Sequence, residues 1–363
     1  MQDDADAIAT DHAQDGLRGL PRIADIARLS GVSTATVDRV LNNRPGVRPA
    51  TIQRVMKAAA ELEYIPESDL SAALAPKPLR LAFLLPDGTN RYLTRLGQLI
   101  RQSEAVLAPM GIRAQVEFIK SFNPELLARG LLQHWRKVDG VAFMALEHPA
   151  VREAVNELAA RNVPTVTVIS DVLNCRRAAY VGLDNRAAGR TAGYLFARFI
   201  GPRAAKVAMI AGSLSYRAHE DRELGFLHFL NEAAPAIEVV GLREAHDDEA
   251  ISYRQMRTLL SHHPDLAGIY SIGGAAEGVA KALKEMRRER DVVFIGHGFT
   301  PETRSLLIDG TMDAVITQDP RGALMSCAGI FTNLRAGRDA LHGIEPPRIE
   351  VIFRENLPQS PLP

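Results

Sequence analysis

Residues 23–43 constrain the fold more than any other part of the chain, because they encode two short helices joined by a glycine turn. The stretch reads IADIARLSGVSTATVDRVLNN. Gly31 supplies the positive φ that such a turn needs, and Ser33 is placed to cap the second helix. This layout is typical of a helix-turn-helix, whose second helix enters a DNA groove. Apolar residues at helical spacing are expected to face inward: Ile23, Ile26, Ala27 and Leu29, then Val37, Val40 and Leu41.

The sequence that follows favours the same interpretation. Pro49 is well placed to open a third helix. Residues 20–60 contain seven basic and two acidic side chains, a net charge of +5, although the whole chain has no net charge. Such asymmetry is typical of a small domain that meets phosphates, attached to a larger one that does not. The alternative is a three-helix protein-interaction module with a solvated basic face.

At these residues the chain resembles the LacI/GalR family of bacterial transcription regulators. The matching run continues after the second helix as VRPATIQRVMKAAAELEYIP. The resemblance implies that the helix opened by Ser33 is the recognition helix of a repressor, which binds a double-stranded DNA operator as a homodimer. It implies these DNA contacts: Ser33, Thr34, Ala35, Thr36, Arg39 and Asn42.

The implied reading residues differ in what they can recognise. Thr34 and Ala35 are small, so they can touch thymine methyl groups but cannot form bidentate hydrogen bonds. Most direct readout therefore falls to Arg39. We expect Asp38 to avoid phosphate and to orient Arg39 instead.

The segment after the third helix corresponds to the family's linker. In relatives this linker folds into a short helix on DNA and inserts a leucine into the minor groove. Here we expect Leu74 to be the leucine that inserts into the minor groove. It stands one place later than the family's usual position, which Ala73 occupies in this chain. Glu67 and Asp69 add negative charge near phosphate, and the alternative is a flexible acidic tether without DNA contact.

Composition favours a soluble cytoplasmic protein. Of 363 residues, 46% are hydrophobic and 24% charged, and no run of 18 apolar residues appears. Residues 1–19 form an acidic stretch without a secretory signal, and we interpret them as a disordered tail. Cys175 and Cys327 lie far apart without metal-ligand spacing, so we expect no disulfide framework. No membrane partner, metal or cofactor is expected.

From Leu79 onward, apolar strands alternate with amphipathic helices, which predicts largely parallel sheets. The strands are too numerous for one compact sheet. We therefore predict an α/β fold in which a small all-α domain, residues 20–65, and a hinge linker, residues 66–78, precede two doubly wound lobes. The resemblance implies the periplasmic sugar-binding fold over residues 79–355, followed by a tail at 356–363. The expected N-lobe is 79–179 with 313–337, and the expected C-lobe is 180–311 with 341–355.

A ligand site is expected where the carboxyl ends of the two sheets face each other across a cleft. Residues that directly follow strands are the candidates, and Arg222 matches the arginine that clamps ligands in the family. Carboxylates, amides and an arginine around an aromatic ring suit vicinal hydroxyls, because each hydroxyl both donates and accepts. The implied effector is a sugar or sugar derivative. The candidate contacts are Asn90, Tyr92, Asp171, Asp184, Asn185, Arg222, Ser271, His297 and Gln318.

Some of these candidates also have a structural interpretation. Asp184 and Asn185 are placed to cap the helix that follows them. Arg222 can be an exposed helix charge, and His297 can be a hydrogen-bonded packing residue. Ser271 stands where relatives favour Asn or Asp, and His297 stands where they favour an acid, so these departures bear on the identity of the ligand more than on the existence of the cleft.

No catalytic signature appears, because P-loop, H-E-x-x-H and G-x-S-x-G patterns are all lacking. His262, His263 and Asp265 cluster at a helix end and can bind a metal, although a solvated helix terminus is favoured. Residues 246–249, HDDE, are interpreted as a charged loop. Two functions remain: a ligand-controlled transcriptional regulator, and a sugar-binding or sugar-processing protein whose N-terminal helices contact another protein.

Overall fold

The computed structural model describes residues 21–74, 77–120 and 122–358. The chain separates into two compact units, residues 1–77 and 78–363. The predicted tail at 1–19 lies outside the described residues, as do the side chains of 71–76. Each unit has hydrophobic cores of its own, and the division between the units falls after residue 77, one residue before the predicted end of the linker at residue 78.

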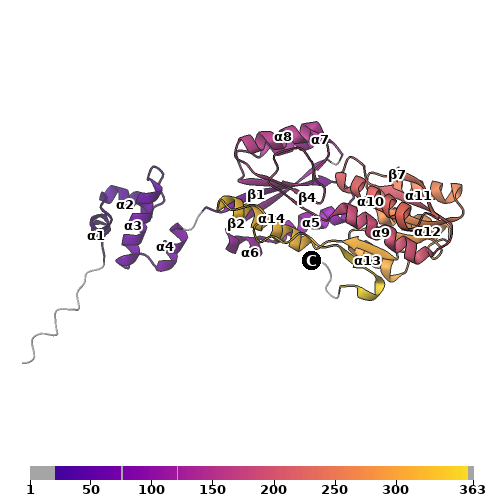
Figure 1. Cartoon of the computed structure of the whole chain (residues 1–363). Helices are drawn as coiled ribbons and strands as arrows, with labels where there is room; N and C mark the ends of the chain where they lie inside the picture. Colours follow the sequence, from indigo (N-terminus) through magenta and orange to yellow (C-terminus); the bar gives the residue numbers. More distant parts are fainter. Residues whose placement is uncertain (1–20, 75–76, 121, 359–363) are drawn as a thin grey trace, which may run out of the picture. The chain divides into compact units, whose positions relative to one another are not determined.

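The first unit contains four helices, labelled in Figure 1: α1 (Ile23–Ser30), α2 (Thr34–Leu41), α3 (Pro49–Glu61) and α4 (Glu67–Leu74). Gly31 adopts φ 67° in the turn between α1 and α2, and Pro49 opens α3, as predicted. The first three helices share one core. Its buried members are Ile26, Ala27, Val37, Val40, Val55, Met56, Ala58 and Ala59.

One predicted core residue of α1 is wrong. Leu29 is 47% exposed, whereas Ser30 is buried and its hydroxyl donates to the carbonyl of Ile26 at 2.6 Å. Counted from Ile23, positions i+3, i+4 and i+7 of the helix share its inward face, and position i+7 is Ser30. Leu29, at i+6, lies outside this face. Helical spacing therefore outweighs side-chain hydrophobicity here.

The second unit begins with a five-stranded parallel sheet in the order β2-β1-β3-β4-β5. Its strands are β1 (Leu79–Asp87), β2 (Ile112–Lys120), β3 (Gly140–Phe143), β4 (Thr165–Val168) and β5 (Ala179–Val181). Helices α7 (Pro124–Gln133) and α8 (Pro149–Ala160) cover one face (Figure 1). The other face carries α5 (Arg91–Gln102), α6 (Glu104–Leu107) and α14 (Pro320–Arg335).

A six-stranded sheet in the order β11-β10-β9-β8-β6-β7 builds the second lobe. Its strands are β6 (Ala205–Ala211), β7 (Ile237–Glu244), β8 (Leu266–Ser271), β9 (Val293–His297), β10 (Ala314–Thr317) and β11 (Glu350–Ile352), and only β11 pairs antiparallel. Helices α9 (Asn185–Ile200) and α10 (Arg217–Ala233) share one core with the sheet. A second core holds α11 (Glu249–His262), α12 (Ala276–Glu285) and α13 (Pro301–Ile308).

The two doubly wound lobes are confirmed, but two predicted crossings between them are displaced. The boundary at 179/180 cuts β5, which pairs with β4 in the first sheet. Residues 313–337, expected in the N-lobe, are divided: β10 pairs with β9 in the second sheet, while α14 inserts Cys327 and Phe331 into the first-lobe core. The chain therefore leaves the first lobe after β5 and leaves the second lobe after β10. Each strand stays with the sheet in which its backbone hydrogen bonds are formed.

Both cysteines are free, Cys175 half-buried and Cys327 buried, so the structure agrees with the absence of a disulfide framework. Burial raises the pKa of the Cys327 thiol to about 12. Within the described parts of the chain, none of the helices has the length and apolar character needed to cross a membrane.

Candidate functional site

The start of α2 presents the expected reading residues to solvent. The backbone nitrogen of Thr36 donates to the Ser33 hydroxyl at 3.2 Å, and the two hydroxyls lie 2.9 Å apart, so Ser33 and Thr36 form the cap. Thr34 and Ala35 are exposed in the first turn, and Arg39 is exposed one turn later. The helix therefore offers these three side chains on its free side.

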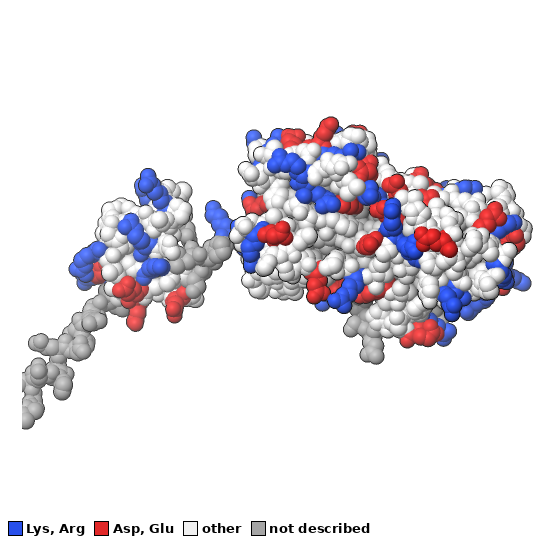
Figure 2. Space-filling model, in the orientation of Figure 1, with Lys and Arg blue, Asp and Glu red and all other residues white. Residues whose placement is uncertain are grey.

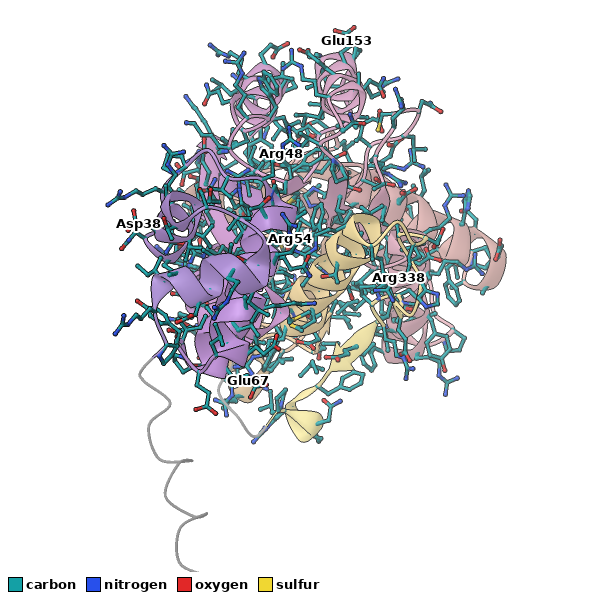
Figure 3. All side chains as sticks on the ribbon, turned by 90° about the vertical axis from the view of Figure 1, so that its left-hand side faces the viewer. Asp38, Arg48, Arg54, Glu67, Glu153 and Arg338 are labelled. Atoms are coloured by element: carbon teal, nitrogen blue, oxygen red, sulfur yellow. The ribbon has the colours of Figure 1, made fainter. Side chains whose placement is uncertain are left out.

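Asp38 does not orient Arg39 as we expected. Its carboxylate accepts from Arg44 Nη1 at 3.1 Å and from Asn42 Nδ2 at 2.9 Å, and in Figure 3 Asp38 lies at the outer edge of the helical unit. The chain bends back after α2, which brings Arg44 to Asp38. Arg39 itself forms no ion pair with any of the described residues, so its guanidinium is available to a ligand.

Charge is unevenly distributed over the first unit. Figure 2 shows Lys and Arg side chains over the upper part of its visible face and acidic side chains along the lower edge. Glu67 and Asp69 stand in the first turn of α4, where negative charge stabilises a helix N-terminus. In Figure 3 Glu67 lies at the lower end of the unit.

The linker is helical through Leu74, and Leu70 packs against the core of the first unit. The segment is thus an extension of the helical unit rather than an unstructured tether over residues 67–74. The side chain of Leu74 lies outside the described ones, so its role as a minor-groove wedge stays a prediction.

A cavity of about 60 Å³ lies in the second unit, lined by residues that follow strands of both sheets. Five of the nine candidate contacts line it: Asn90, Tyr92, Arg222, His297 and Gln318. Its apolar wall consists of Leu93, Met144, Ile169, Leu183 and Ile316. The choice of residues that directly follow strands, called the strand-end rule below, therefore located the cavity. Ligand contact by these residues stays a prediction.

Four candidates are not among the lining residues, and three of them are Asp171, Asp184 and Ser271. Asp171 accepts from the Thr167 hydroxyl at 2.6 Å and from Arg177 Nη2 at 2.5 Å. Asp184 caps α9 by accepting from the Ala187 backbone nitrogen at 2.9 Å, which is the helix-cap alternative. Ser271 is buried, and its hydroxyl has no hydrogen-bond partner among the described residues. All three residues follow strands, but Asp171 and Asp184 bond to local partners and Ser271 is buried away from the cavity lining.

The fourth candidate outside the lining, Asn185, positions Arg222. Asn185 Oδ1 accepts from Arg222 Nε at 2.8 Å, and Asn185 Nδ2 donates to the Tyr180 hydroxyl at 3.0 Å. Arg222 Nη1 donates to the carbonyl of Ile272 at 2.8 Å. Arg222 is only 8% exposed, so the interpretation of it as an exposed helix charge is wrong.

Two glycines bring the backbones of α9 and α10 together beside Arg222. A Cβ atom at Gly189 would lie 2.0 Å from the Arg222 carbonyl oxygen. A Cβ atom at Gly225 would lie 2.1 Å from the carbonyl oxygen of Arg186. No larger residue fits either position without moving a helix. Gly189 and Gly225 thus belong to the packing that holds Arg222 in place.

Two histidines lie at the cavity, and sequence reasoning missed His219. His219 is buried with Nδ1 2.8 Å from the Ser213 carbonyl oxygen, and burial lowers its pKa to about 4. His297 Nε2 lies 2.7 Å from the Tyr270 hydroxyl, and burial together with Arg222 holds its pKa well below its ordinary value. Both rings are therefore neutral at neutral pH. His219 stands three residues before Arg222 on one helix, and this spacing was the available signal.

Asp247 was also missed, because residues 246–249 were interpreted as a charged loop. It is 6% exposed, and its two carboxylate oxygens accept from Asn90 Nδ2 at 2.9 Å and from the Gly274 backbone nitrogen at 2.6 Å. The Thr89 hydroxyl donates to the Asp247 carbonyl. Thr89 and Asn90 follow β1 while Asp247 follows β7, so these bonds join the two lobes. The strand-end rule, applied to β7, would have found Asp247.

The metal alternative finds no geometric support. No group of three or more His, Cys, Asp or Glu side chains among the described residues is arranged to hold a metal ion. Asp265, one of the candidate ligands, forms an ion pair with Lys206 at 2.9 Å.

Residues 22–67 match the family described as bacterial regulatory proteins, lacI family, and residues 113–338 match the periplasmic binding protein domain. The transcriptional repressor PurR of Vibrio atlanticus (strain LGP32) is 29% identical over 220 residues, covering 58% of this chain and 61% of that protein. The transcriptional regulator DegA of Bacillus subtilis (strain 168) is 25% identical over 217 residues, covering 60% and 62%. The matched part thus spans about three-fifths of both relatives' length.

Among solved structures, the chain is similar to GanP, a glucose-galactose binding protein from Geobacillus stearothermophilus. The TM-score is 0.71 at 27% sequence identity, and the match covers 78% of this chain and 100% of that one. The two-lobed architecture is therefore that of a periplasmic binding protein domain.

Proposed function

The chain belongs to the LacI family of bacterial regulatory proteins and carries a periplasmic binding protein domain, and from this we propose that it is a transcriptional repressor controlled by a small carbohydrate-like effector. The observation that carries the proposal is one chain with both an unpaired arginine on a capped, exposed helix and a cavity between two lobes that polar side chains help to line. The first can contact DNA, and the second can sense a metabolite.

The DNA-binding form is a cytoplasmic homodimer on a pseudo-palindromic operator. A two-fold dimer presents two recognition helices to successive major grooves, so each half-site meets one α2. Thr34 and Ala35 contact base edges or methyl groups and Arg39 supplies the hydrogen-bonding readout. Ser33, Thr36 and Asn42 fix the register of the helix on the backbone. Leu74 adds the minor-groove contact of the linker.

The effector lies in the cavity and changes operator affinity by changing how the lobes close. Tyr92 supplies the stacking surface, while Asn90, Arg222, His297 and Gln318 supply polar contacts. The bonds from Thr89 and Asn90 to Asp247 join the lobes beside this cavity, so a ligand there and the closure of the lobes affect each other.

The test begins by selecting duplexes that the full-length protein binds from a random DNA pool. Gel shifts on a selected duplex follow at 50 and 200 mM salt. A protein that makes about six to ten phosphate contacts loses roughly 10³ to 10⁵ in affinity across that range. We expect the selected sites to be pseudo-palindromic and their affinity to fall steeply with salt. Binding that is independent of salt, or a pool without enrichment, would contradict the proposal.

A further inference from the structure

Arg222 is a buried cation without a carboxylate partner. Its Nε and Nη1 atoms donate to Asn185 Oδ1 and to the Ile272 carbonyl oxygen, both at 2.8 Å and both neutral acceptors. Nη2 makes no hydrogen bond to any residue in the described ranges, and no acidic oxygen of those ranges lies within ion-pair distance. A buried charge that lacks a counter-charge is strongly destabilising, so this arginine serves something other than stability.

The remaining polar groups do not neutralise it. His219 and His297 stay uncharged at neutral pH, and the lining contains no Asp or Glu. The carboxylate of Asp247 acts on Arg222 only from beyond ion-pair distance, and its oxygens accept from Asn90 and from the Gly274 backbone nitrogen. The cavity wall at neutral pH therefore carries one positive charge, from Arg222, and no negative one.

The cavity lining offers no carboxylate acceptor for hydroxyl groups. Gln318 Oε1 is buried without a hydrogen-bond partner, whereas Asn90 Oδ1 already accepts from the Leu93 backbone nitrogen. A neutral sugar needs an acceptor for each hydroxyl that donates, and an ionised carboxylate is the side chain best suited to this because it accepts only and forms the stronger bond. The two candidate carboxylates that would have done so, Asp171 and Asp184, are engaged elsewhere.

Building on the proposed function, we infer that the effector is an acidic, carbohydrate-derived compound whose carboxylate pairs with Arg222 and whose hydroxyl donates to Gln318 Oε1. The ligand thereby supplies the missing counter-charge and the missing donor together. A carboxylate fits better than a phosphate ester, because one guanidinium balances a single charge and a phosphate ester carries nearly two near neutral pH.

The test compares matched pairs of a neutral compound and its acid on the full-length protein. The pairs are glycerol with D-glycerate, D-glucose with D-gluconate and D-galactose with D-galactonate, and D-glucose 6-phosphate serves as the phosphate arm. Thermal unfolding is followed first, and calorimetry then measures affinity for any compound that raises the Tm. We expect at least one carboxylate to raise the Tm while its neutral partner does not.

Two variants separate the charge effect from misfolding. Gln318→Glu keeps the size of the side chain but places a carboxylate beside the ligand, so affinity for the acid should fall at least about tenfold. Asp184→Asn changes a charge outside the cavity while leaving a capping side chain, so it should leave that affinity unchanged. Gel shifts without ligand on the selected duplex should be the same for Asp184→Asn and for wild type.

The inference is overturned if neutral members raise the Tm as much as their acids, if only the phosphate ester acts, or if no acid acts. It is also overturned if Gln318→Glu binds the acid as well as wild type. In each of these cases the operator gel shift still reports on the regulator, so failure of this inference is distinguishable from failure of the proposed function.

Discussion

The two arginines that matter most, Arg39 on α2 and Arg222 on α10, are positioned in opposite ways. Arg39 is exposed on an eight-residue helix whose start is set by a local serine cap. Arg222 is buried, and it is held by Asn185, by a carbonyl from another loop and by the contact of two helix backbones. A surface contact residue needs only a local pattern, whereas a cavity residue needs long-range packing. Substitutions should therefore affect the two regions very differently.

The largest effect is expected from Gly225→Ala. The added methyl group would meet the Arg186 carbonyl oxygen, so α9 and α10 must separate. Overpacking of this kind typically costs about 1–3 kcal/mol or more, and a backbone clash belongs at the upper end. We expect the free energy of unfolding of the second unit, measured by urea denaturation, to fall accordingly. Arg198→Ala, on the exposed side of α9, is the control and should change it little. Equal stability of both variants would mean that the helices tolerate separation.

Acid should destabilise the cavity region through His219. Its folded pKa of about 4 lies below the ordinary 6.5, so between these values the unfolded chain binds a proton that the native chain does not. The contribution of neutral His219 to the free energy of unfolding is therefore fully present above about pH 6.5, and it declines as the pH falls toward 4. His219→Gln should flatten this decline in urea midpoints measured from pH 7 to 4.5. His228→Gln, at an exposed position of the same helix, should retain the wild-type profile. An unchanged slope in His219→Gln would place the acid sensitivity elsewhere.

Arg39→Ala tests the exposed side of the comparison without a packing change. Loss of its hydrogen bonds to a base should cost about 1–3 kcal/mol on the operator and relax selectivity at one symmetric position. Gel shifts on single-base variants of the selected duplex measure both effects, and protein stability should be unaltered. If the variant binds with wild-type affinity and selectivity, then Arg39 is not a reading residue.

The smallest effect is expected from Asp38→Ala, which removes the ion pair with Arg44. Both side chains are largely exposed, at 41% and 62%, and exposed pairs contribute roughly 0–1 kcal/mol. The thermal midpoint of the first unit should therefore hardly move. A loss well above 1 kcal/mol would show that the contacts of Asp38 with Asn42 and Arg44 hold the end of α2 in place, and the contrast with Arg222 would weaken.

Local pattern predicted the first unit almost completely. Gly31, Ser33 and Pro49 act on their immediate neighbours, so their effects on the turn and on two helix starts are readable from sequence. Leu29 was misplaced only because its hydrophobicity was weighed above its helical position. The alternation of strands and helices likewise predicted two parallel sheets with a cavity at their carboxyl ends.

What the sequence by itself determined is thus the order of elements and the edge of each sheet at which a site lies, because both follow from short-range periodicity. Only the tertiary structure decided which strand-end side chains line the cavity. Asp171 turned to Arg177, Asn185 to Arg222, and Asp247 joined the lobes through Asn90. These partners lie between 6 and 157 residues apart in the chain. The hydrogen-bond partner of a side chain at a strand end depends on all the donors and acceptors that folding brings near it. A local sequence pattern contains no information on those groups.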